Sequence, residues 1–124
     1  MAFIPKRVKY RKVMKGSRTG LSVAGSRVSY GDFGLKALES GNLSHTQLEM
    51  IRVSLARALR RSGKSWIRLF ADKPVTKKPQ EVRMGKGKGD VDHWDAIIPR
   101  GRVILEVAGV PRDYAQTVFK KIAY

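Results

Sequence analysis

The sequence predicts an α+β fold in which two helices pack on one side of a small sheet that is mostly antiparallel or mixed. Two observations indicate this body. Apolar residues recur at helical spacing in two segments, and several short segments alternate apolar and polar residues. A third observation adds an extended basic arm, because residues 1–31 hold eight basic residues and no acidic one. We therefore expect an arm over residues 1–31 and a single α+β domain over residues 32–124.

The arm is predicted to lack stable helix, because Pro5 and three glycines interrupt it. We expect it to become ordered only against a partner. Basic, acid-free N-termini are also typical of organellar transit peptides, but proline and glycines disfavour the amphipathic helix that such peptides use. The basic side chains are those of Lys6, Arg7, Lys9, Arg11, Lys12, Lys15, Arg18 and Arg27.

A bent strand or strand pair is predicted for residues 28–38, and the first helix follows it. Ser44 and Gln47 have the spacing of a capping box, in which each side chain satisfies a backbone amide of the other residue. Gly63 is expected to end this helix. Its apolar face comprises Leu48, Ile51, Leu55, Ala58 and Leu59, and its opposite, basic side comprises Arg57, Arg60 and Arg61.

The remaining body is predicted to contain strands and a closing helix. Residues 65–70 alternate as a strand, residues 71–79 form an extended connector with two prolines, and residues 93–98 and 102–108 form a strand pair. Pro111 suits the first position of the closing helix, where its missing N–H is not needed. The apolar face of that helix comprises Tyr114, Ala115, Val118, Phe119 and Ile122.

A loop rich in glycine and lysine separates the connector from the strand pair. Glycine allows another molecule to approach the main chain closely, and the lysines place cations beside the exposed amides. The alternative is a flexible surface turn that binds no ligand, but the basic arm and the positive net charge of the chain favour contact with phosphate. The loop comprises Arg83, Met84, Gly85, Lys86, Gly87, Lys88 and Gly89.

Composition favours a polyanionic partner. The 124 residues include 26 lysines and arginines against ten acids, which gives a formal net charge of +16. Repulsion between so many cationic side chains destabilises a compact monomer. Without cysteine there is no disulfide framework or thiolate chemistry. The apolar stretches are much shorter than the roughly 20 residues of a membrane-spanning helix. Nucleic acid, and RNA in particular, is the predicted partner.

The sequence offers little for catalysis, so we predict no catalytic residue, metal or cofactor. The two histidines lie far apart, and the loop lacks the Ser or Thr and the following helix of a nucleotide-binding P-loop. Asp90, Asp92, His93 and Asp95 could ligate a metal ion. Strand alternation would send Asp92 and His93 to opposite faces, so a turn followed by a solvated strand start is favoured.

Aromatic residues offer a second kind of RNA contact. Trp66 and Phe70, beside Arg68, could stack on unpaired bases. The same spacing equally describes the second buried face of a strand, which is favoured because aromatic residues are more often buried. The arginines of the first helix could likewise be a solvated face, but they lack acidic partners one turn away.

The chain resembles the bacterial-type family of large-subunit ribosomal protein sixteen (L-sixteen), whose archaeal and eukaryotic relatives include the L-ten-e proteins. The resemblance runs in order over nearly the whole chain, and the run from Arg83 to Gly89 is its most specific part. The matching stretches are Pro5-Lys6-Arg7, Tyr10-Arg11-Lys12, Lys15-Gly16, Phe33-Gly34-Leu35-Lys36-Ala37, Gly63-Lys64, Trp66-Ile67-Arg68, Asp72-Lys73-Pro74-Val75-Thr76, Lys78-Pro79, Val82 with the loop, and Gly109-Val110-Pro111.

This resemblance implies a non-catalytic constituent of the large ribosomal subunit, in a bacterium, mitochondrion or plastid. Its partners would be large-subunit ribosomal RNA, the tRNA acceptor arm and neighbouring ribosomal proteins. The loop and arm would lie near the peptidyl-transferase centre and help organise the aminoacyl-tRNA site, and the arginine at position 83 is hydroxylated in some bacterial members. By matching position, the resemblance implies RNA contacts for Lys6, Arg7, Arg11 and Lys12 of the arm, and contacts with RNA and the tRNA acceptor arm for Arg83, Lys86 and Lys88 of the loop. Their positive charge adds further predicted RNA-binding residues, which are Lys9, Lys15 and Arg18 of the arm and Arg57, Arg60, Arg61, Lys64 and Arg68 of the body.

The sequence departs from the family in three places. Its first five residues are a longer opening than usual, and Ala71 stands where bacterial members have proline. It ends at Tyr124, before the family's usual final strand, so either that strand is absent and the sheet is one strand short, or the sequence is clipped. Two other classes remain open: an extraribosomal basic RNA-binding protein, and a small metal-dependent RNA-processing enzyme built on the region of Asp92, His93 and Asp95.

Overall fold

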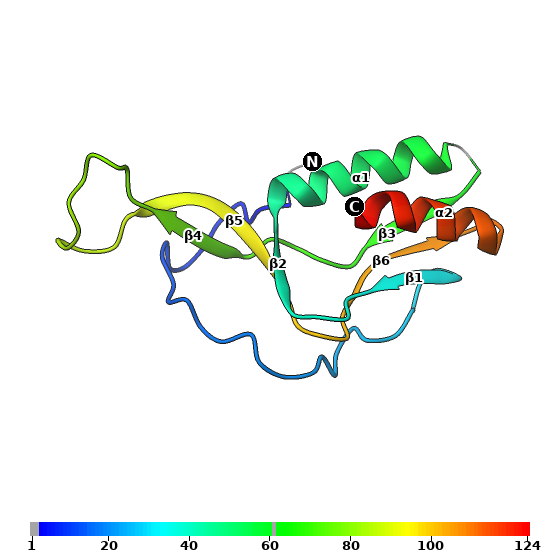
Figure 1. Ribbon diagram of the computed structural model, residues 1–124, viewed down its shortest axis with the longest axis horizontal. Helices are drawn as coiled ribbons and strands as arrows, with labels where there is room; N and C mark the ends of the chain where they lie inside the picture. The colour runs from blue at the N-terminus through cyan, green and yellow to red at the C-terminus, as the bar shows by residue number, and fades with distance from the viewer. Residues whose placement is uncertain (1–2, 61) are drawn as a thin grey trace.

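Two helices and six strands make up the computed structural model, which describes residues 3–60 and 62–124 (Figure 1). The α+β class and the antiparallel pairing are confirmed, but the strands form two three-stranded sheets where the sequence predicted one. In the first sheet β6 (Val103–Ala108) lies between β1 (Phe33–Lys36) and β3 (Lys64–Ile67). In the second, β5 (Asp90–Ile98) lies between β2 (Gly41–Ser44) and β4 (Lys73–Lys77).

The first helix, α1 (His45–Leu59), begins as predicted. The Ser44 side chain accepts a hydrogen bond from the Gln47 amide, and the Gln47 side chain accepts one from the Ser44 amide, which completes the capping box. The end of α1 was predicted incorrectly, because Arg60 and not Gly63 caps it. The absence of a side chain at Gly63 instead allows the Val110 side chain to pack closely, since a Cβ at Gly63 would lie 3.0 Å from it.

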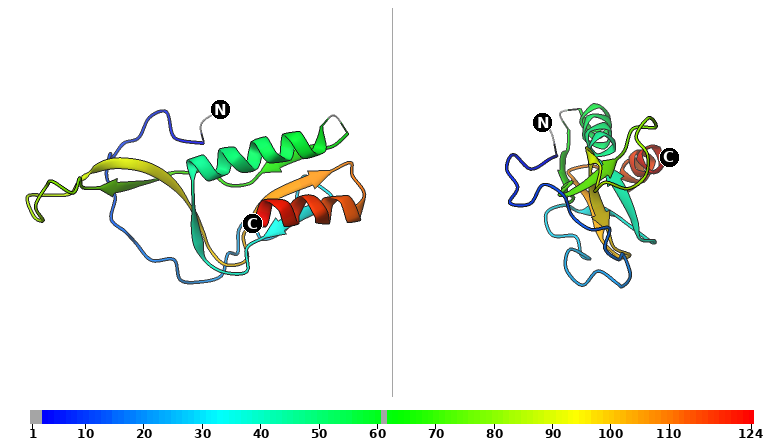
Figure 2. Two further views of the ribbon diagram at one scale, coloured as in Figure 1. Left: turned by 45° about the horizontal axis from the view of Figure 1, so that its top comes forward. Right: turned by 90° about the vertical axis from the view of Figure 1, so that its left-hand side faces the viewer.

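The closing helix, α2 (Arg112–Ala123), begins one residue later than predicted. Pro111 is its N-cap, with an extended backbone (φ −61°, ψ 152°), and the first helical residue is Arg112. The two helices lie side by side on one face of the sheet β1-β6-β3 (Figure 2). The Tyr114 hydroxyl of α2 donates a hydrogen bond of 2.5 Å to the Ala58 carbonyl oxygen of α1.

Two strand predictions were wrong. The segment predicted as an extended connector contains β4, whose buried Pro74 lies opposite Trp94 of β5. An edge strand tolerates proline, because the missing N–H would have faced outward. β5 and β6 were predicted to pair, but the chain turns at Gly101 (φ +88°) and carries β6 into the other sheet. At this corner the Ala37 backbone pairs with Gly101 and Arg102.

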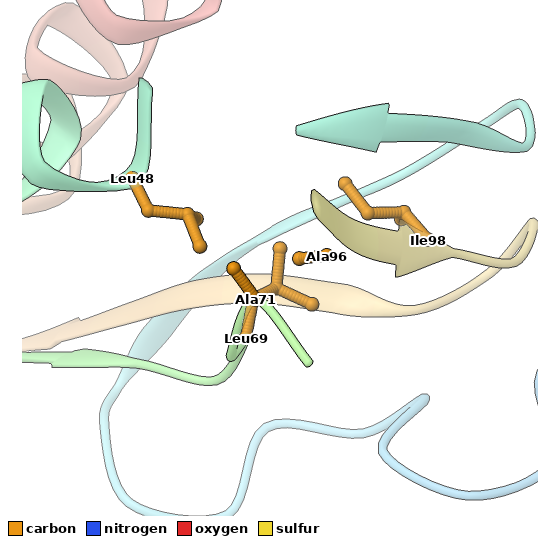
Figure 3. Close-up of a cluster of buried hydrophobic side chains, with 5 residues drawn as sticks. All are labelled: Leu48, Leu69, Ala71, Ala96 and Ile98. Carbon is orange, nitrogen blue, oxygen red and sulfur yellow. The ribbon is translucent and has the colours of Figure 1, made fainter. Parts of the chain in front are cut away.

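The hydrophobic core consists of two neighbouring clusters. The first packs the start of α1 on the second sheet, through Leu48, Leu69, Ala71, Ala96 and Ile98 (Figure 3). The second lies under both helices and comprises Leu55, Leu59, Leu105, Val107 and Val118. Ile51 and Ile67 pack against both clusters and join them. The predicted apolar faces of the two helices are therefore confirmed as core faces, except at Tyr114, which is 44% exposed.

The molecule is elongated, and the β4–β5 hairpin projects from one end of the long axis (Figures 1 and 2). The C-terminal end of α1 lies at the opposite end (Figure 1). None of the helices in the described part of the chain is long and apolar enough to cross a membrane.

The conformation at the end of α1 leads to a stability prediction. Arg60, directly after α1, has a positive φ of 51° with ψ −117°. That position favours glycine, because a Cβ is strained there. Arg60→Gly should raise the free energy of unfolding by about 1 kcal/mol in urea denaturation.

Arg57→Gly is the matched control, since it makes the same substitution inside α1. It should lower the free energy of unfolding by about 1 kcal/mol, because glycine is a poor residue for a helix interior. Equal destabilisation by the two substitutions would show that Arg60 is not strained.

Candidate nucleic-acid interface

The glycine-lysine loop, residues 83–89, lies at the tip of the projecting hairpin between β4 and β5 (Figure 1). Its backbone is left-handed at three successive residues: Gly85 (φ +96°), Lys86 (φ +54°) and Gly87 (φ +94°). The side chains of Arg83, Met84, Lys86 and Lys88 are exposed, and Gly89 is half-buried. The Lys78 ammonium donates to the Gly85 carbonyl oxygen and so steadies one side of the loop. A strand follows the loop, as predicted, but it begins at Asp90, three residues before the predicted start at His93.

Lysine side chains connect the arm to this hairpin. The Lys12 Nζ donates to the Lys88 carbonyl oxygen at 3.0 Å and lies 3.4 Å from an oxygen of Asp90. In return, the Lys88 Nζ donates to the carbonyl oxygen of Val13 at 2.5 Å. The Lys73 ammonium donates to the Lys15 carbonyl oxygen nearby. The two predicted RNA-binding segments, far apart in the sequence, therefore form one cationic projection.

The other predicted arm residues are all exposed. A parallel bridge joins Leu21 to Arg100, and the Ser22 amide donates to the Arg100 carbonyl oxygen at 2.8 Å. Before the basic stretch, the Phe3 carbonyl oxygen accepts a hydrogen bond of 3.1 Å from the Ala71 amide, so the chain contacts the body both before Lys6 and after Arg18. Between these contacts, the side chains that reach solvent are those of Lys6, Arg7, Lys9, Arg11, Lys15 and Arg18.

The buried carboxylate of Glu106, on β6, holds the point where the arm joins the body. It accepts hydrogen bonds from the backbone amides of Ser29 at 3.1 Å, Tyr30 at 2.6 Å and Gly31 at 2.8 Å, and it pairs with Arg68. Burial alone would raise the pKa of Glu106, but the three amides and the guanidinium outweigh it and hold that pKa below its ordinary value. The carboxylate therefore stays ionised and fixes the end of the arm.

Arg68 was predicted to bind RNA, but its charge is paired with Glu106. Its guanidinium carbon also lies 4.9 Å from the centre of the Tyr30 ring. Phe70, favoured as a buried residue, is instead 49% exposed, and Trp66 is half-buried and stacks on Tyr30. Sequence reasoning missed Tyr30, because nothing local indicated that residues 29–31 would reach β6.

The remaining predicted cations lie away from the loop. Arg57 and Arg60 are exposed near the end of α1, and Lys64 is exposed at the start of β3. Arg61 lies outside the described residues. The C-terminal end of α1 and the hairpin are at opposite ends of the molecule, so the predicted RNA-binding residues form two separate groups (Figure 1).

The acidic residues of β5 engage His93 in an unpredicted way. Although Asp92 and His93 are adjacent on a strand, the His93 Nδ1 lies 2.7 Å from an Asp92 oxygen, and the Nε2 lies 3.3 Å from an Asp95 oxygen. The hydrogen bond with His93 lowers the pKa of Asp92, although partial desolvation opposes it. Within residues 3–60 and 62–124, no group of three or more His, Asp or Glu side chains is placed to hold a metal ion.

Comparison with known proteins identifies the family. The family model described as ribosomal protein L16p/L10e matches residues 5–124. This chain belongs to that family. The resemblance inferred from the arm and loop motifs is thereby confirmed.

Curated relatives of this L16p/L10e chain are named large ribosomal subunit protein uL16. The protein from Halorhodospira halophila is 54% identical over 119 residues, covering 96% of this chain and 87% of the relative. The protein from Protochlamydia amoebophila is 50% identical over 123 residues, covering 99% and 88%. The protein from Xanthomonas campestris pv. campestris is 50% identical over 119 residues, covering 96% and 87%.

The Glu106 contacts lead to a pH prediction for this L16p/L10e chain. Because the folded pKa lies below the unfolded one, the ionised carboxylate stabilises the fold above the ordinary value of 4.5, and this stability is lost as pH falls through the folded pKa. Glu106→Gln should lower the free energy of unfolding at pH 7 by about 3 kcal/mol, because it leaves the guanidinium of Arg68 without its counter-charge. Urea denaturation between pH 7 and pH 3 measures both effects.

Glu39→Gln, at an exposed glutamate, is the control. It should change stability by less than about 0.5 kcal/mol. The difference in stability between wild type and Glu106→Gln should shrink as the solution is acidified. A difference that stays constant down to pH 3 would contradict the assigned role of the carboxylate.

Proposed function

We propose that this chain is a non-catalytic constituent of the large ribosomal subunit that binds large-subunit ribosomal RNA through its arm and loop. We further propose that the loop contacts the tRNA acceptor arm and helps organise the aminoacyl-tRNA site near the peptidyl-transferase centre. Neighbouring ribosomal proteins are its other partners. The ribosome is that of a bacterium or an organelle, and the bacterial relatives favour the first.

The cationic projection formed by the arm and the loop is the observation that carries this proposal. Lys12 and Lys88 each bind a carbonyl oxygen of the other segment, so the arm and loop are held together as one slender unit. A slender backbone with exposed lysines can enter spaces between RNA strands that a globular domain cannot. Arg83 and Lys86 remain exposed at the tip, where they can reach phosphates.

The proposed mechanism is electrostatic. Lysine and arginine neutralise phosphates and release the counterions condensed on RNA, which makes affinity fall steeply with salt. In our proposal residues 1–31 act as the reaching arm, and residues 32–124 form the domain that positions it. The exposed Arg57, Arg60 and Lys64 would bind RNA at the opposite end of the molecule.

Salt dependence tests the RNA contacts. We expect log K for binding to large subunits depleted of this protein to fall linearly with log salt, by about 0.7 to 0.9 for each phosphate neutralised. Replacing Lys6 and Arg7 together by Ala should reduce the slope by about two. Lys120→Ala, on α2, is the control and should leave the slope unchanged. Sedimentation of labelled protein with the subunits measures the binding.

Two results would count against the proposal. A slope near zero would exclude phosphate neutralisation as the source of affinity. A protein that remains in the unbound fraction at low salt would instead favour an extraribosomal role.

Lys86 offers the sharpest test of the loop. No hydrogen bond or ion pair of the described residues involves its side chain, so Lys86→Glu should leave the free energy of unfolding within about 0.5 kcal/mol of wild type. Loss of a charge-assisted contact to the tRNA acceptor arm should slow tRNA accommodation or peptidyl transfer about tenfold or more. Rapid-kinetic assays on reconstituted ribosomes measure these steps.

Lys120→Glu makes the same charge change on α2 and should not slow these steps. Adding Lys88→Glu to Lys86→Glu should deepen the defect, because Lys88 also holds Val13 of the arm. Normal accommodation and peptidyl transfer by the double variant would overturn the assigned role of the loop.

A further inference from the structure

An aromatic and cationic cluster lies on the face of the sheet β1-β6-β3 that the helices do not cover. Leu105 and Val107 of β6 pack under the helices, so Glu106 between them points to the opposite face. Trp66 lies opposite Glu106 in the β3–β6 register and shares that face. The Tyr30 ring lies over this face, with its centre 6.3 Å from that of Trp66 and the two planes 27° apart.

The Tyr30 ring remains largely exposed although two side chains contact it. Trp66 and Arg68 are two residues apart, and the Arg68 amide continues the strand pairing by donating to the Ile104 carbonyl oxygen at 2.9 Å. Their side chains therefore point to the same face of the sheet, where both contact the Tyr30 ring. Despite these two contacts, Tyr30 keeps an exposed fraction of 63%, so much of the ring remains accessible to a partner.

The backbone beneath this ring is fixed independently of the ring itself. The amides of Ser29, Tyr30 and Gly31 all donate to the buried Glu106 carboxylate. A Cβ at Gly31 would come within 2.7 Å of the Val107 carbonyl oxygen, so this segment lies directly against β6. The exposed tyrosine ring is thus held in position before any partner binds, which reduces the entropy lost on binding.

A groove beside the cluster offers a site for phosphate. It is formed by the segment of the arm that precedes Tyr30 and by Arg68 of the body. In the described part of the chain, no hydrogen bond or ion pair engages the Arg27 guanidinium, and this side chain is exposed. The groove is lined mainly by Ser22, Gly25, Ser26, Arg27, Ser29 and Arg68.

We propose that Tyr30 is a stacking platform for an unpaired RNA base, and that Arg27 binds a phosphate of the same strand in the adjoining groove. This inference rests on the proposed function, RNA binding, and identifies Tyr30 as a residue that contacts a base. Base stacking on an aromatic face is tolerant of sequence, and the guanidinium of Arg68 beneath the ring adds to the platform. The buried acid of this cluster, Glu106, does not oppose an anion, because its charge is paired with that of Arg68.

The first test compares variants of the full chain for binding to large subunits depleted of this protein. Tyr30→Ala should weaken binding about tenfold and leave the salt slope unchanged, because stacking involves no charge. Tyr30→Phe keeps the aromatic face and should bind within about twofold of wild type. Arg27→Ala should lower the salt slope by about one. Tyr124→Ala removes another exposed tyrosine and is the control.

The second test uses the wild-type protein and so does not depend on the folding of a variant. Ultraviolet cross-linking of the bound protein at 254 nm, followed by mass spectrometry, should find a nucleotide joined to Tyr30. A Tyr30 adduct with a peptide of a neighbouring protein would overturn the RNA assignment. So would equal binding by Tyr30→Ala, Tyr30→Phe and Tyr124→Ala.

The two proposals can fail separately. If wild type binds the subunits with a steep salt slope but Tyr30 makes no difference and forms no nucleotide adduct, the stacking proposal is wrong and the phosphate contacts of the arm and loop stand. If wild type does not bind at all, the proposed function fails, and the stacking proposal with it. Circular dichroism of each variant separates loss of binding from loss of fold.

Discussion

The buried carboxylate of Glu106 is the interaction on which the arrangement of the arm depends. A charge removed from water is destabilising unless hydrogen bonds and an opposite charge replace its hydration. Here the replacements come from three consecutive amides of residues 29–31 and from Arg68. Because all three amides must converge on one side chain, the end of the arm has a single position relative to β6. The arm therefore leaves the body in a defined direction, although its described residues, 3–31, form no helix and no extended strand.

Two acidic residues of this strongly basic chain lie beside cationic side chains that are important for the arrangement of the arm. Asp90 lies beside Lys12 at the base of the loop, and Glu106 neutralises Arg68. Lys12, Lys73 and Lys88 also donate to backbone carbonyl oxygens, which can solvate an ammonium without cancelling its charge. The projection thus keeps most of its positive potential. Repulsion between these lysines opposes the close approach of arm and loop, and a polyanion between or beside them would relieve it.

Local interactions explain the parts of the fold that could be predicted from the sequence. The capping box of α1 and the apolar faces of both helices depend on residues three or four apart, and they were predicted correctly apart from the exposed Tyr114. The division of the strands between two sheets could not be predicted, because it depends on the corner at Gly101 and on pairing with the distant Ala37. The same reason applies to β4, whose proline is tolerated only because that strand lies at an edge.

The candidate site shows the same distinction between local and distant contacts. The glycine-lysine loop could be found from composition, because its chemistry lies within seven adjacent residues. Arg68 could not be assigned in this way, since its counter-charge is 38 residues away, and Tyr30 depends on amides that bind a residue 76 positions later. A basic residue in such a chain is therefore a reliable candidate for phosphate contact only once its acidic neighbours in space are known. By that criterion Arg27, Arg83 and Lys86 are better candidates than Arg68, whose charge is already balanced and whose flat guanidinium instead supports an aromatic ring.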